Sequence, residues 1–265
     1  MTALCIVRAR AATVTVPAKL RDAVPVIEVR VNGSRPLAFV LDTGSSRMLL
    51  DSSLIVPLGL TRGAADSIHG AGAGPVAVTS IDDEITLAVG SLQSSGYHFD
   101  ATDLSHVGLR DHIDGILGYD FLERHVVLID YARSQVTFDP ASPPRGSREV
   151  PISIEGKWPF VRATVLQAGR APLADKFLID TGSGDAVDHP SIKGRKTPVG
   201  SGLGQPLPGR IGTADFELAG FRFANVTMVA GSGSELGKRL IGGGMLANFV
   251  VTIDYANARM YLLRR

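Results

Sequence analysis

Short apolar runs bounded by glycine, serine, aspartate or proline recur along the whole chain. They lie at residues 76–79, 84–89, 126–130 and 135–138, and again at 214–218, 221–229 and 250–255. Runs of this length, rich in β-branched and aromatic residues, are typical of strands. Helical signals are short and lie at residues 119–124 and 243–248. The pattern predicts an all-β protein, because strands do not alternate with helices.

These runs belong to an internal repeat. Residues 116–138 read ILGYDFLERHVVLIDYARSQVTF and residues 240–262 read LIGGGMLANFVVTIDYANARMYL, so that Ile-Asp-Tyr-Ala recurs in phase. A second pair of copies opens each half, with FVLDTGSS at residues 39–46 and FLIDTGSG at residues 177–184. The repeat predicts two lobes of similar structure.

The boundary between the lobes follows from composition. The stretch DPASPPRGSR at residues 139–148 is rich in proline, serine and glycine, as exposed linkers are. We therefore expect an N-terminal extension or signal remnant at 1–20, a first lobe at 21–140, a linker at 141–148 and a second lobe at 149–265. Gly118 follows Asp42 by 76 positions and Gly242 follows Asp180 by 62, so the first lobe carries extra residues in its middle.

Composition and charge narrow the range of partners. Apolar residues make up 45% of the chain, charged residues 20%, and the net charge is +1. This balance gives no electrostatic reason to expect nucleic acid or a membrane surface as a partner. The single cysteine, Cys5, excludes an intrachain disulfide and a cysteine-based metal site. No apolar run approaches the roughly 18 residues of a membrane-spanning helix.

The first residues leave two interpretations open. Residues 3–7 are apolar and Arg8 and Arg10 follow them, whereas a signal peptide has its basic residues first. The segment is either the end of a longer export signal or an N-terminal extension, disordered or strand-forming. An export route would favour a periplasmic or secreted location over the cytoplasm.

The Asp-Thr-Gly turns carry the candidate chemistry. Residues 39–41 form an apolar strand that ends in Asp42, and a carboxylate there is expensive to bury unless it is hydrogen-bonded. Gly44 lets its N–H approach closely, and the Ser45 hydroxyl can donate to the same carboxylate. One such turn is usually an ordinary strand end. Two copies in matching positions indicate a paired site built on Asp42 and Asp180.

With these residues the sequence resembles the aspartic peptidases, the clan of pepsin and the retroviral proteases. That clan has D-[TS]-G-[STA] in each lobe and a hydrophobic-hydrophobic-Gly element behind it, matched here by residues 116–118 and 240–242. The resemblance runs from about residue 22 to 263. The lobes are closest to retroviral-type lobes fused in tandem, as in bacterial proteins of this kind.

The resemblance implies an acid-protease fold of two pseudo-symmetric β-barrel-like lobes with a central cleft. It implies an aspartic endopeptidase that acts on peptide or protein substrates without a metal or other cofactor. It also implies a monomer, because one chain supplies both aspartates.

The resemblance also implies a role for each residue that matches the family's site motif. Asp42 and Asp180 would share one proton and activate a water, since like charges in contact cannot both ionise. Around them, the resemblance implies cross-bonding threonines, glycine N–H groups that face the carboxylates and serine hydroxyls that hold them. These supporting residues are Thr43, Gly44 and Ser45 in the first lobe and Thr181, Gly182 and Ser183 in the second.

Members of this clan cover the substrate with a hairpin flap. We place its tip in the first lobe, at His69, Gly70, Ala71, Gly72, Ala73 and Gly74. Alternating glycines suit a mobile tip that approaches a peptide backbone. The tyrosine of pepsin-type flaps is missing nearby, and the segment could equally be a surface loop. Residues 200–212 are a second glycine-rich candidate.

Two alternatives to a general peptidase remain open. A binding or scaffold protein could keep this fold without catalysis, since fold does not fix function. Intact Asp-Thr-Gly turns in both lobes favour the enzyme. The sequence does not separate broad digestion from processing of a few substrates.

Overall fold

The protein is described here by a computed structural model that covers residues 12–70, 72, 74–105, 107, 112–199, 203, 207–231 and 239–265. The strands of the first half are β1 (Val14–Arg21), β2 (Val24–Val31), β3 (Leu37–Leu41), β4 (Leu49–Asp51), β5 (Arg62–His69), β6 (Pro75–Ile81), β7 (Ile85–Val89), β8 (Leu92–Tyr97), β9 (Asp100–Thr102), β10 (Gly115–Leu117), β11 (Val127–Asp130) and β12 (Gln135–Phe138).

The strands of the second half are β13 (Arg148–Pro151), β14 (Ser153–Glu155), β15 (Trp158–Leu166), β16 (Leu173–Asp180), β17 (Val187–Asp188), β18 (Arg195–Val199), β19 (Leu207–Leu218), β20 (Phe221–Gly231), β21 (Leu240–Gly242), β22 (Phe249–Asp254) and β23 (Arg259–Arg264). Two one-turn helices, α1 (Tyr119–Leu122) and α2 (Gly243–Leu246), follow β10 and β21, and a 3₁₀ turn spans Ser52–Leu54. The all-β prediction is confirmed, and the helices lie within the two segments that favoured helix.

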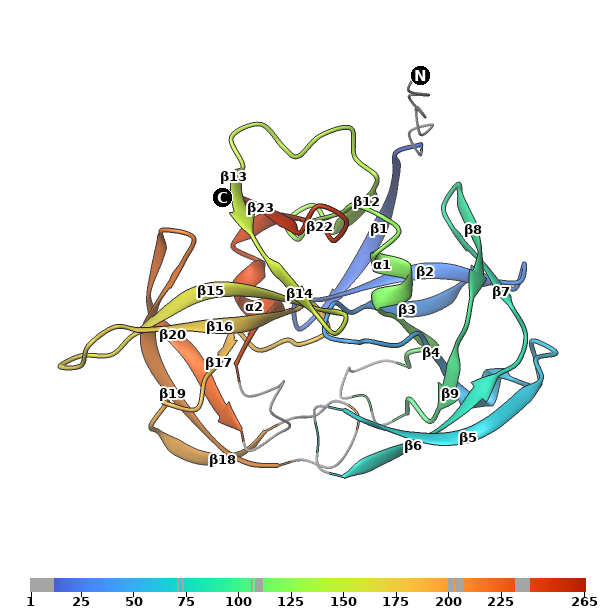
Figure 1. Ribbon diagram of the computed structural model, residues 1–265, viewed down its shortest axis with the longest axis horizontal. Coiled ribbons are helices and arrows are strands. Elements are labelled where there is room, and N and C mark those ends of the chain that lie inside the picture. Colours follow the sequence, from blue (N-terminus) through green and yellow to red (C-terminus); the bar gives the residue numbers. More distant parts are fainter. Residues whose placement is uncertain are drawn as a thin grey trace, which may run out of the picture.

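The strands form two sheets, shown in Figure 1. The larger has the order β13-β23-β22-β11-β12-β1-β2-β3-β10-β4-β9-β6-β5, with β7 and β8 attached to β2. The smaller has the order β14-β15-β16-β21-β17-β20-β19-β18 and belongs entirely to the second half. Three strands of the second half, β13, β22 and β23, complete the larger sheet.

The two copies of the C-terminal repeat pair with each other. Strand β11 runs antiparallel to β22, with Val127 opposite Ile253 and Ile129 opposite Val251. Because Val127 and Val251 are equivalent positions of the repeat, this register has a pseudo-two-fold axis between the strands. The sheet thus joins the halves through identical sequence elements.

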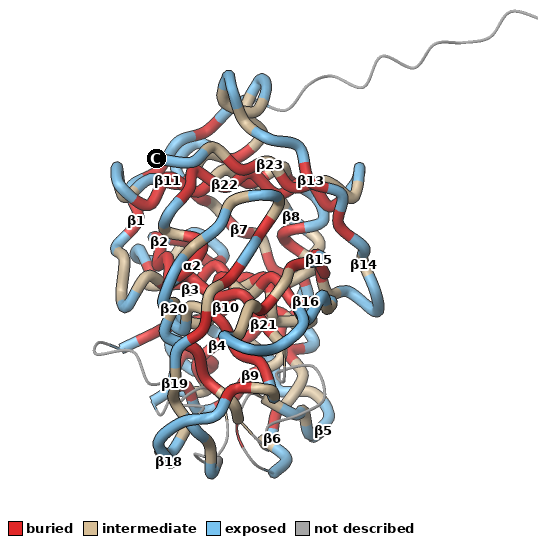
Figure 2. The backbone as a smooth tube through the Cα atoms, turned by 90° about the vertical axis from the view of Figure 1, so that its left-hand side faces the viewer, coloured by how far each residue is buried: buried red, intermediate tan, exposed pale blue. Residues whose placement is uncertain are grey.

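Matching strands also form the centre of each half. Strand β10 lies parallel to β3 and antiparallel to β4, and β21 lies parallel to β16 and antiparallel to β17. These central strands are buried, as Figure 2 shows for β10 and β21. Strands buried on both faces consist of continuous apolar runs, as residues 39–41 do.

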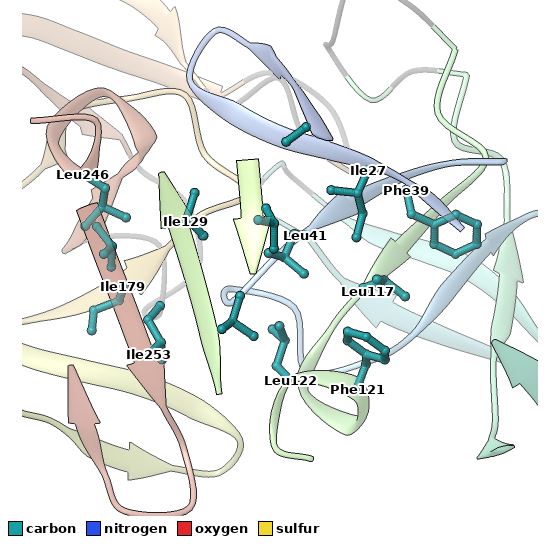
Figure 3. Packing of buried hydrophobic residues seen from close by; sticks show 14 of the residues in the cluster. Ile27, Phe39, Leu41, Leu117, Phe121, Leu122, Ile129, Ile179, Leu246 and Ile253 are labelled. Carbon is teal, nitrogen blue, oxygen red and sulfur yellow. The ribbon is translucent and has the colours of Figure 1, made fainter. Parts of the chain in front are cut away.

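One hydrophobic core extends across both halves. Its fully buried members include Leu41 and Ile129 of the first half and Ile179, Leu246 and Ile253 of the second. In Figure 3 these side chains lie in one continuous cluster between the central strands. The core therefore fixes the ends of β3 and β16 relative to each other.

The N-terminal segment differs in part from an extension outside the lobes. Residues 14–20 fall within the predicted extension and form most of β1, which pairs with β12 and β2. Val14, Val16 and Ala18 alternate inward and are buried, so apolar alternation adds this segment to the sheet. Residues 1–11 lie outside the described part of the chain.

Candidate active site

Each aspartate of the Asp-Thr-Gly turns stands at the end of a central strand. Asp42 follows β3 and donates its backbone N–H to the Leu117 carbonyl at 3.0 Å. Asp180 ends β16, in register with Gly242 of β21. Because the hydrophobic-hydrophobic-Gly strands lie beside β3 and β16, the fold directs both turns towards the pseudo-two-fold axis.

The carboxyl groups of Asp42 and Asp180 are hydrogen-bonded to each other. Each also accepts a backbone N–H from its own turn: Gly44 N lies 2.8 Å from Asp42 Oδ1, and Gly182 N lies 3.0 Å from Asp180 Oδ1. Both aspartates are half-buried rather than enclosed. The structure thus brings the two predicted aspartates together and leaves them open to small molecules from solvent.

The two threonines join the turns beneath the carboxyl groups. Thr43 N donates to Thr181 Oγ1 at 3.1 Å, and Thr181 N donates to Thr43 Oγ1 at 3.0 Å. The hydroxyls then donate across the axis, from Thr43 to the Ile179 carbonyl and from Thr181 to the Leu41 carbonyl, both at 2.6 Å. Both threonines are buried. All four groups are therefore satisfied, as buried polar groups require.

The glycines of the turns sit against the opposite carboxyl group. A Cβ atom on Gly44 would lie 2.6 Å from Asp180 Cγ, and one on Gly182 would lie 2.3 Å from Asp42 Cγ. Real Cβ atoms do not approach other heavy atoms so closely. Glycine at these two positions is what allows the two turns to meet.

The serines differ from the expected arrangement. The Ser45 hydroxyl donates to the Arg47 carbonyl at 2.8 Å, so its one proton is not available to Asp42. The Ser45 backbone N–H donates to the main-chain carbonyl of Asp42 at 3.3 Å. The Ser183 hydroxyl accepts the N–H of Asp185 at 3.2 Å. The expectation that the Ser45 hydroxyl holds the carboxylate is wrong, because the hydroxyl serves the turn that follows.

Burial sets the protonation of the aspartate pair. Desolvation raises the pKa of Asp42, although the N–H of Gly44 opposes that rise. The pKa of Asp180 is raised well above its usual value, first by desolvation and then by the adjacent charge of Asp42. These effects favour one shared proton on the pair, and the apparent values belong to the pair as a whole.

Several buried polar residues near the pair escaped the sequence-based prediction. The repeat tyrosines Tyr131 and Tyr255 are buried, and desolvation and the charge of the pair raise the pKa of both. Asp188 is buried and hydrogen-bonded to the exposed Asp185. Desolvation raises the pKa of Asp188 well above its usual value, and the charges of Asp185 and Asp180 add to the rise. The in-phase repeat could have identified the tyrosines, but no local motif marks Asp188.

The predicted flap segment is the tip of the hairpin β5–β6. His69 ends β5 opposite Pro75 of β6, and Gly70, Gly72 and Gly74 lie between them. Ala71 and Ala73 lie outside the described residues. Gly72 N donates to the Leu203 carbonyl of the second half at 2.9 Å. Figure 1 shows this hairpin and β18 on the same side of the molecule, so each half contributes chain to this face.

Of the second candidate segment, residues 200–212, the structure describes Leu203 and residues 207–212. The latter begin β19, which pairs with β18. Leu203 and Ile68 of β5 pack on the same small apolar cluster, which includes Val24, Val40 and Ile116. The two glycine-rich segments considered for the flap are therefore in contact with each other, one from each half.

Arg47 links the first Asp-Thr-Gly turn to the β5–β6 hairpin. Its guanidinium group bonds Asp100 of β9 at 2.6 Å and Asp66 of β5 at 3.3 Å. Arg47 lies only five residues after Asp42 in the chain. Its ion pairs therefore connect the β5–β6 hairpin to the first Asp-Thr-Gly turn. In the second half the equivalent position is Asp185.

Two surface grooves lie on the second half, away from the aspartate pair. One, of about 1350 Å³, is lined by Pro190, Lys196 and Arg210, and the other, of about 680 Å³, by Gln167 and Asp215. Neither includes a residue of the Asp-Thr-Gly turns. Within the described residues no group of three or more His, Cys, Asp or Glu side chains could hold a metal ion. In the same residues no helix is long and apolar enough to cross a membrane.

The two-lobed all-β fold, with its paired Asp-Thr-Gly turns, is the fold of the aspartic peptidases. Residues 27–121 match the family model for aspartyl protease. The crystal structure of aspartic proteinase from Irpex lacteus is similar with a TM-score of 0.64 and 15% identity, over 96% of this chain and 97% of that chain. At this identity the structural likeness shows the fold alone. No curated protein sequence matches the chain.

Proposed function

We propose that this chain is an aspartic endopeptidase that hydrolyses peptide bonds with a water activated between Asp42 and Asp180. The observation that carries the proposal is the hydrogen bond between their carboxyl groups, made where both side chains are still partly open to solvent. Both aspartates come from one chain, so the proposed active form is a monomer.

The reaction follows from the shared proton. The ionised carboxylate accepts a proton from the attacking water, while the protonated carboxyl donates its proton to the oxygen of the scissile carbonyl. The tetrahedral diol then collapses: one carboxylate takes back a hydroxyl proton and the other carboxyl protonates the leaving amine. The pair ends as it began, with one proton, and no covalent intermediate is formed.

A peptide substrate would lie in extended form between the aspartate pair and the hairpin tips. The tips offer backbone groups there, since Gly70 and Gly72 lack side chains and adjoin Leu203. Backbone hydrogen bonds to an extended peptide give affinity with little dependence on its sequence. This supports a peptide or protein substrate rather than a small molecule.

The test compares the wild-type chain with Asp42→Asn and Asp180→Asn on a diverse peptide library between pH 3 and pH 8. We expect turnover by the wild type, inhibition by a statine-type transition-state mimic, and loss of turnover in each variant without unfolding. Asp215→Asn, which changes a surface carboxylate paired with Arg222, serves as the matched control and should retain activity. Robust hydrolysis by Asp42→Asn would remove that residue from its assigned role.

The rival scaffold function has its own signature in the same experiment. A non-catalytic protein of this fold would bind the statine-type peptide but release no products from the library at any pH. That result, with purified wild-type protein of native fold, would replace the proposed hydrolase with a peptide-binding protein.

A further inference from the structure

The larger surface groove of the second half, of about 1350 Å³, has a basic lining. Its side chains include Arg170, Lys193, Lys196 and Arg210, and no acidic side chain is among the described residues that line it. All four cations are exposed. The chain as a whole has a net charge of only +1. The concentration of positive charge is therefore a local feature of this surface, which we call the basic groove.

Two of these cations lie directly opposite each other on neighbouring strands. Lys196 of β18 pairs with Arg210 of β19 in the antiparallel register, and both side chains line the basic groove. Like charges in directly opposed positions destabilise a sheet. An arrangement that costs stability without a compensating contact is expected at functional sites. The opposed pair therefore indicates a ligand with negative charge.

The four cations have no acidic partner in the part of the chain that the structure describes. Arg170 donates to the neutral amide oxygen of Gln167 at 3.1 Å, and Arg210 donates to a backbone carbonyl at 3.3 Å. The side chains of Lys193 and Lys196 form neither a hydrogen bond nor an ion pair with the described residues. Because a guanidinium group has five N–H donors and an ammonium group three, most donors of the groove are free for a ligand.

The acid closest to the basic groove is already neutralised. The smaller groove shares Arg170 and Lys193 with the basic groove, and Asp215 is the one acid among its described lining residues. Asp215 bonds Arg222 at 2.9 Å and accepts the backbone N–H of Asn225 at 3.0 Å. Its charge is therefore engaged elsewhere and does not offset the basic groove.

The remaining lining indicates the kind of anion. Pro198 and Pro208 lie opposite each other on β18 and β19, next to the charged pair, and Pro190 and Ala230 add further apolar surface. No aromatic side chain is among the described lining residues, so the bases of a nucleic acid have no ring on which to stack. Apolar surface between cations fits a peptide segment in which carboxylate side chains are interspersed with apolar ones.

Side chains, rather than an added strand, would give the recognition. Strand β18 is at the edge of the smaller sheet (Figure 1), where an extended peptide can pair as a further strand. Pro198 lies within this edge and has no N–H to donate, and proline in an edge strand discourages such pairing. The affinity would therefore come from ion pairs between ligand carboxylates and the four cations.

We propose that the basic groove binds an acidic segment of a polypeptide through the carboxylates of that segment. The strands β18 and β19 also flank Leu203 in the chain, and the Leu203 carbonyl accepts the Gly72 N–H of the β5–β6 hairpin. The groove thus belongs to the same part of the chain that meets the predicted flap. In a peptidase it would select substrates with acidic residues away from the cleaved bond. That role rests on the proposed function, whereas the binding itself does not.

The binding test uses the full-length Asp42→Asn protein, which should leave a peptide probe uncut. The probe is a fluorescein-labelled peptide of glutamate, alanine and proline with blocked ends, and the control peptide has glutamine in place of glutamate. Fluorescence anisotropy should show saturable binding of the glutamate peptide, weakening as NaCl screens the charges. The glutamine peptide should not bind. Equal binding of the two peptides, or binding of neither, would overturn the proposal.

A matched pair of double variants locates the site. Lys196→Gln/Arg210→Gln removes the opposed cations, and Arg162→Gln/Arg195→Gln removes as much charge from exposed positions that do not line the groove. Arg195 precedes Lys196 on β18, so its side chain lies on the other face of the sheet.

Each partly exposed ion pair changes an affinity by about two- to fivefold. The groove variant should therefore bind the glutamate peptide about four- to twentyfold more weakly than the parent protein, and the control variant less than twofold more weakly. Neither should melt at a lower temperature, since the first substitution relieves a repulsion and the second changes exposed side chains. Equal losses in both variants would show a general effect of charge and would refute the assignment of the groove.

A short single-stranded oligothymidylate provides the competing ligand class. If unlabelled oligothymidylate displaces the probe at lower concentrations than the unlabelled glutamate peptide does, the groove serves nucleic acid and the proposal is wrong. We expect the glutamate peptide to be the stronger competitor, because the described lining has no stacking surface.

A kinetic test separates the groove from the proposed function. Two substrates share one cleavable sequence, and only one of them carries the acidic segment beyond it. The wild type should have a severalfold higher kcat/KM on the acidic substrate, and Lys196→Gln/Arg210→Gln should lose that preference while keeping its kcat on the plain one. Equal kcat/KM for both substrates in the wild type would refute the selective role. If the wild type cuts neither substrate but the groove binds the glutamate peptide, the proposed function is wrong and the binding site stands.

Discussion

Thr43 and Thr181 exchange hydrogen bonds across the boundary between the two halves, N–H to hydroxyl in both directions, at 3.1 and 3.0 Å. Each hydroxyl then donates to a carbonyl of the opposite strand. The two Asp-Thr-Gly turns are thereby a single mechanical unit, although the threonines are 138 residues apart in the chain.

Replacing one threonine should lower the free energy of unfolding by more than the loss of an exposed hydrogen bond would. Thr181→Val keeps the shape but leaves the Leu41 carbonyl and the Thr43 N–H without their partners. Buried groups left unpaired in this way cost about 1–3 kcal/mol. Urea unfolding should show this loss, and Thr181→Ser should restore most of it. The double variant Thr43→Val/Thr181→Val should lose less than the two single losses together, since the residues are in contact. Strict additivity would show that the threonines act independently.

The buried carboxyl of Asp188 should make stability depend on pH. Its pKa is raised in the folded protein, so the folded state binds more protons than the unfolded state above about pH 4. The free energy of unfolding therefore falls as the pH rises from that value through the folded-state pKa, by up to about 1.4 kcal/mol per pH unit for one proton.

Asp188→Asn removes that contribution and should leave the others in place. We expect the variant to match the wild type near pH 4 and to melt at a higher temperature near pH 8. Asp188→Leu should behave alike, since it copies Leu49, which pairs with Ile116 in the first half as Asp188 pairs with Leu240 in the second. A variant that is less stable than the wild type at both pH values would mean that the ionised carboxylate is stabilised by groups other than Asp185.

The bond between Arg47 and Asp66 should matter for substrate binding. Arg47→Met frees β5 from the first turn, so the β5–β6 hairpin should close less readily on a peptide. We expect KM to rise a few-fold with a smaller change in kcat, in keeping with the modest strength of partly exposed ion pairs. Asp66→Asn should reproduce the effect, and Arg62→Met on the same strand is the control. Equal kinetics for Arg47→Met and the wild type would contradict the coupling.

A methyl group on Gly44 should damage catalysis directly. An alanine Cβ there would meet the Asp180 carboxyl at 2.6–2.8 Å, so the carboxyl or the turn must move. Displacements near 1 Å at reacting groups can lower rates about 100-fold. Gly44→Ala should therefore lose at least that factor in kcat, and Gly182→Ala the same. Thermal melting of both variants would separate this effect from unfolding, and full activity in either would contradict the close approach.

The sequence predicts those features of the fold and site that depend on the local residue pattern and on the internal repeat. Residues 39–42 and 177–180 specify buried strands that end in aspartates, and the in-phase copies imply a symmetric pair. The pairing of β11 with β22 brings together residues from both copies of the repeat, as duplication suggests. These features need no knowledge of side-chain packing.

Contacts between distant turns were beyond such reasoning. The Ser45 hydroxyl bonds the residue two positions later rather than the carboxylate, a choice that depends on turn geometry. Trp158 of the second half donates its indole N–H to the Gly44 carbonyl of the first at 2.9 Å, and no sequence motif marks this residue. Asp188 sits where the first half has a leucine, so the repeat pattern argues against a buried acid there.

The sheet that joins the halves should hold the protein together when the linker between them is cut. Its neighbours β11 and β22 come from opposite sides of the linker, yet each completes the other's hydrogen bonding. A protease that nicks the chain between Phe138 and Arg148 would cut the covalent connection and leave this shared ladder intact. The fragments would stay together, and neither would contain both Asp42 and Asp180 on its own.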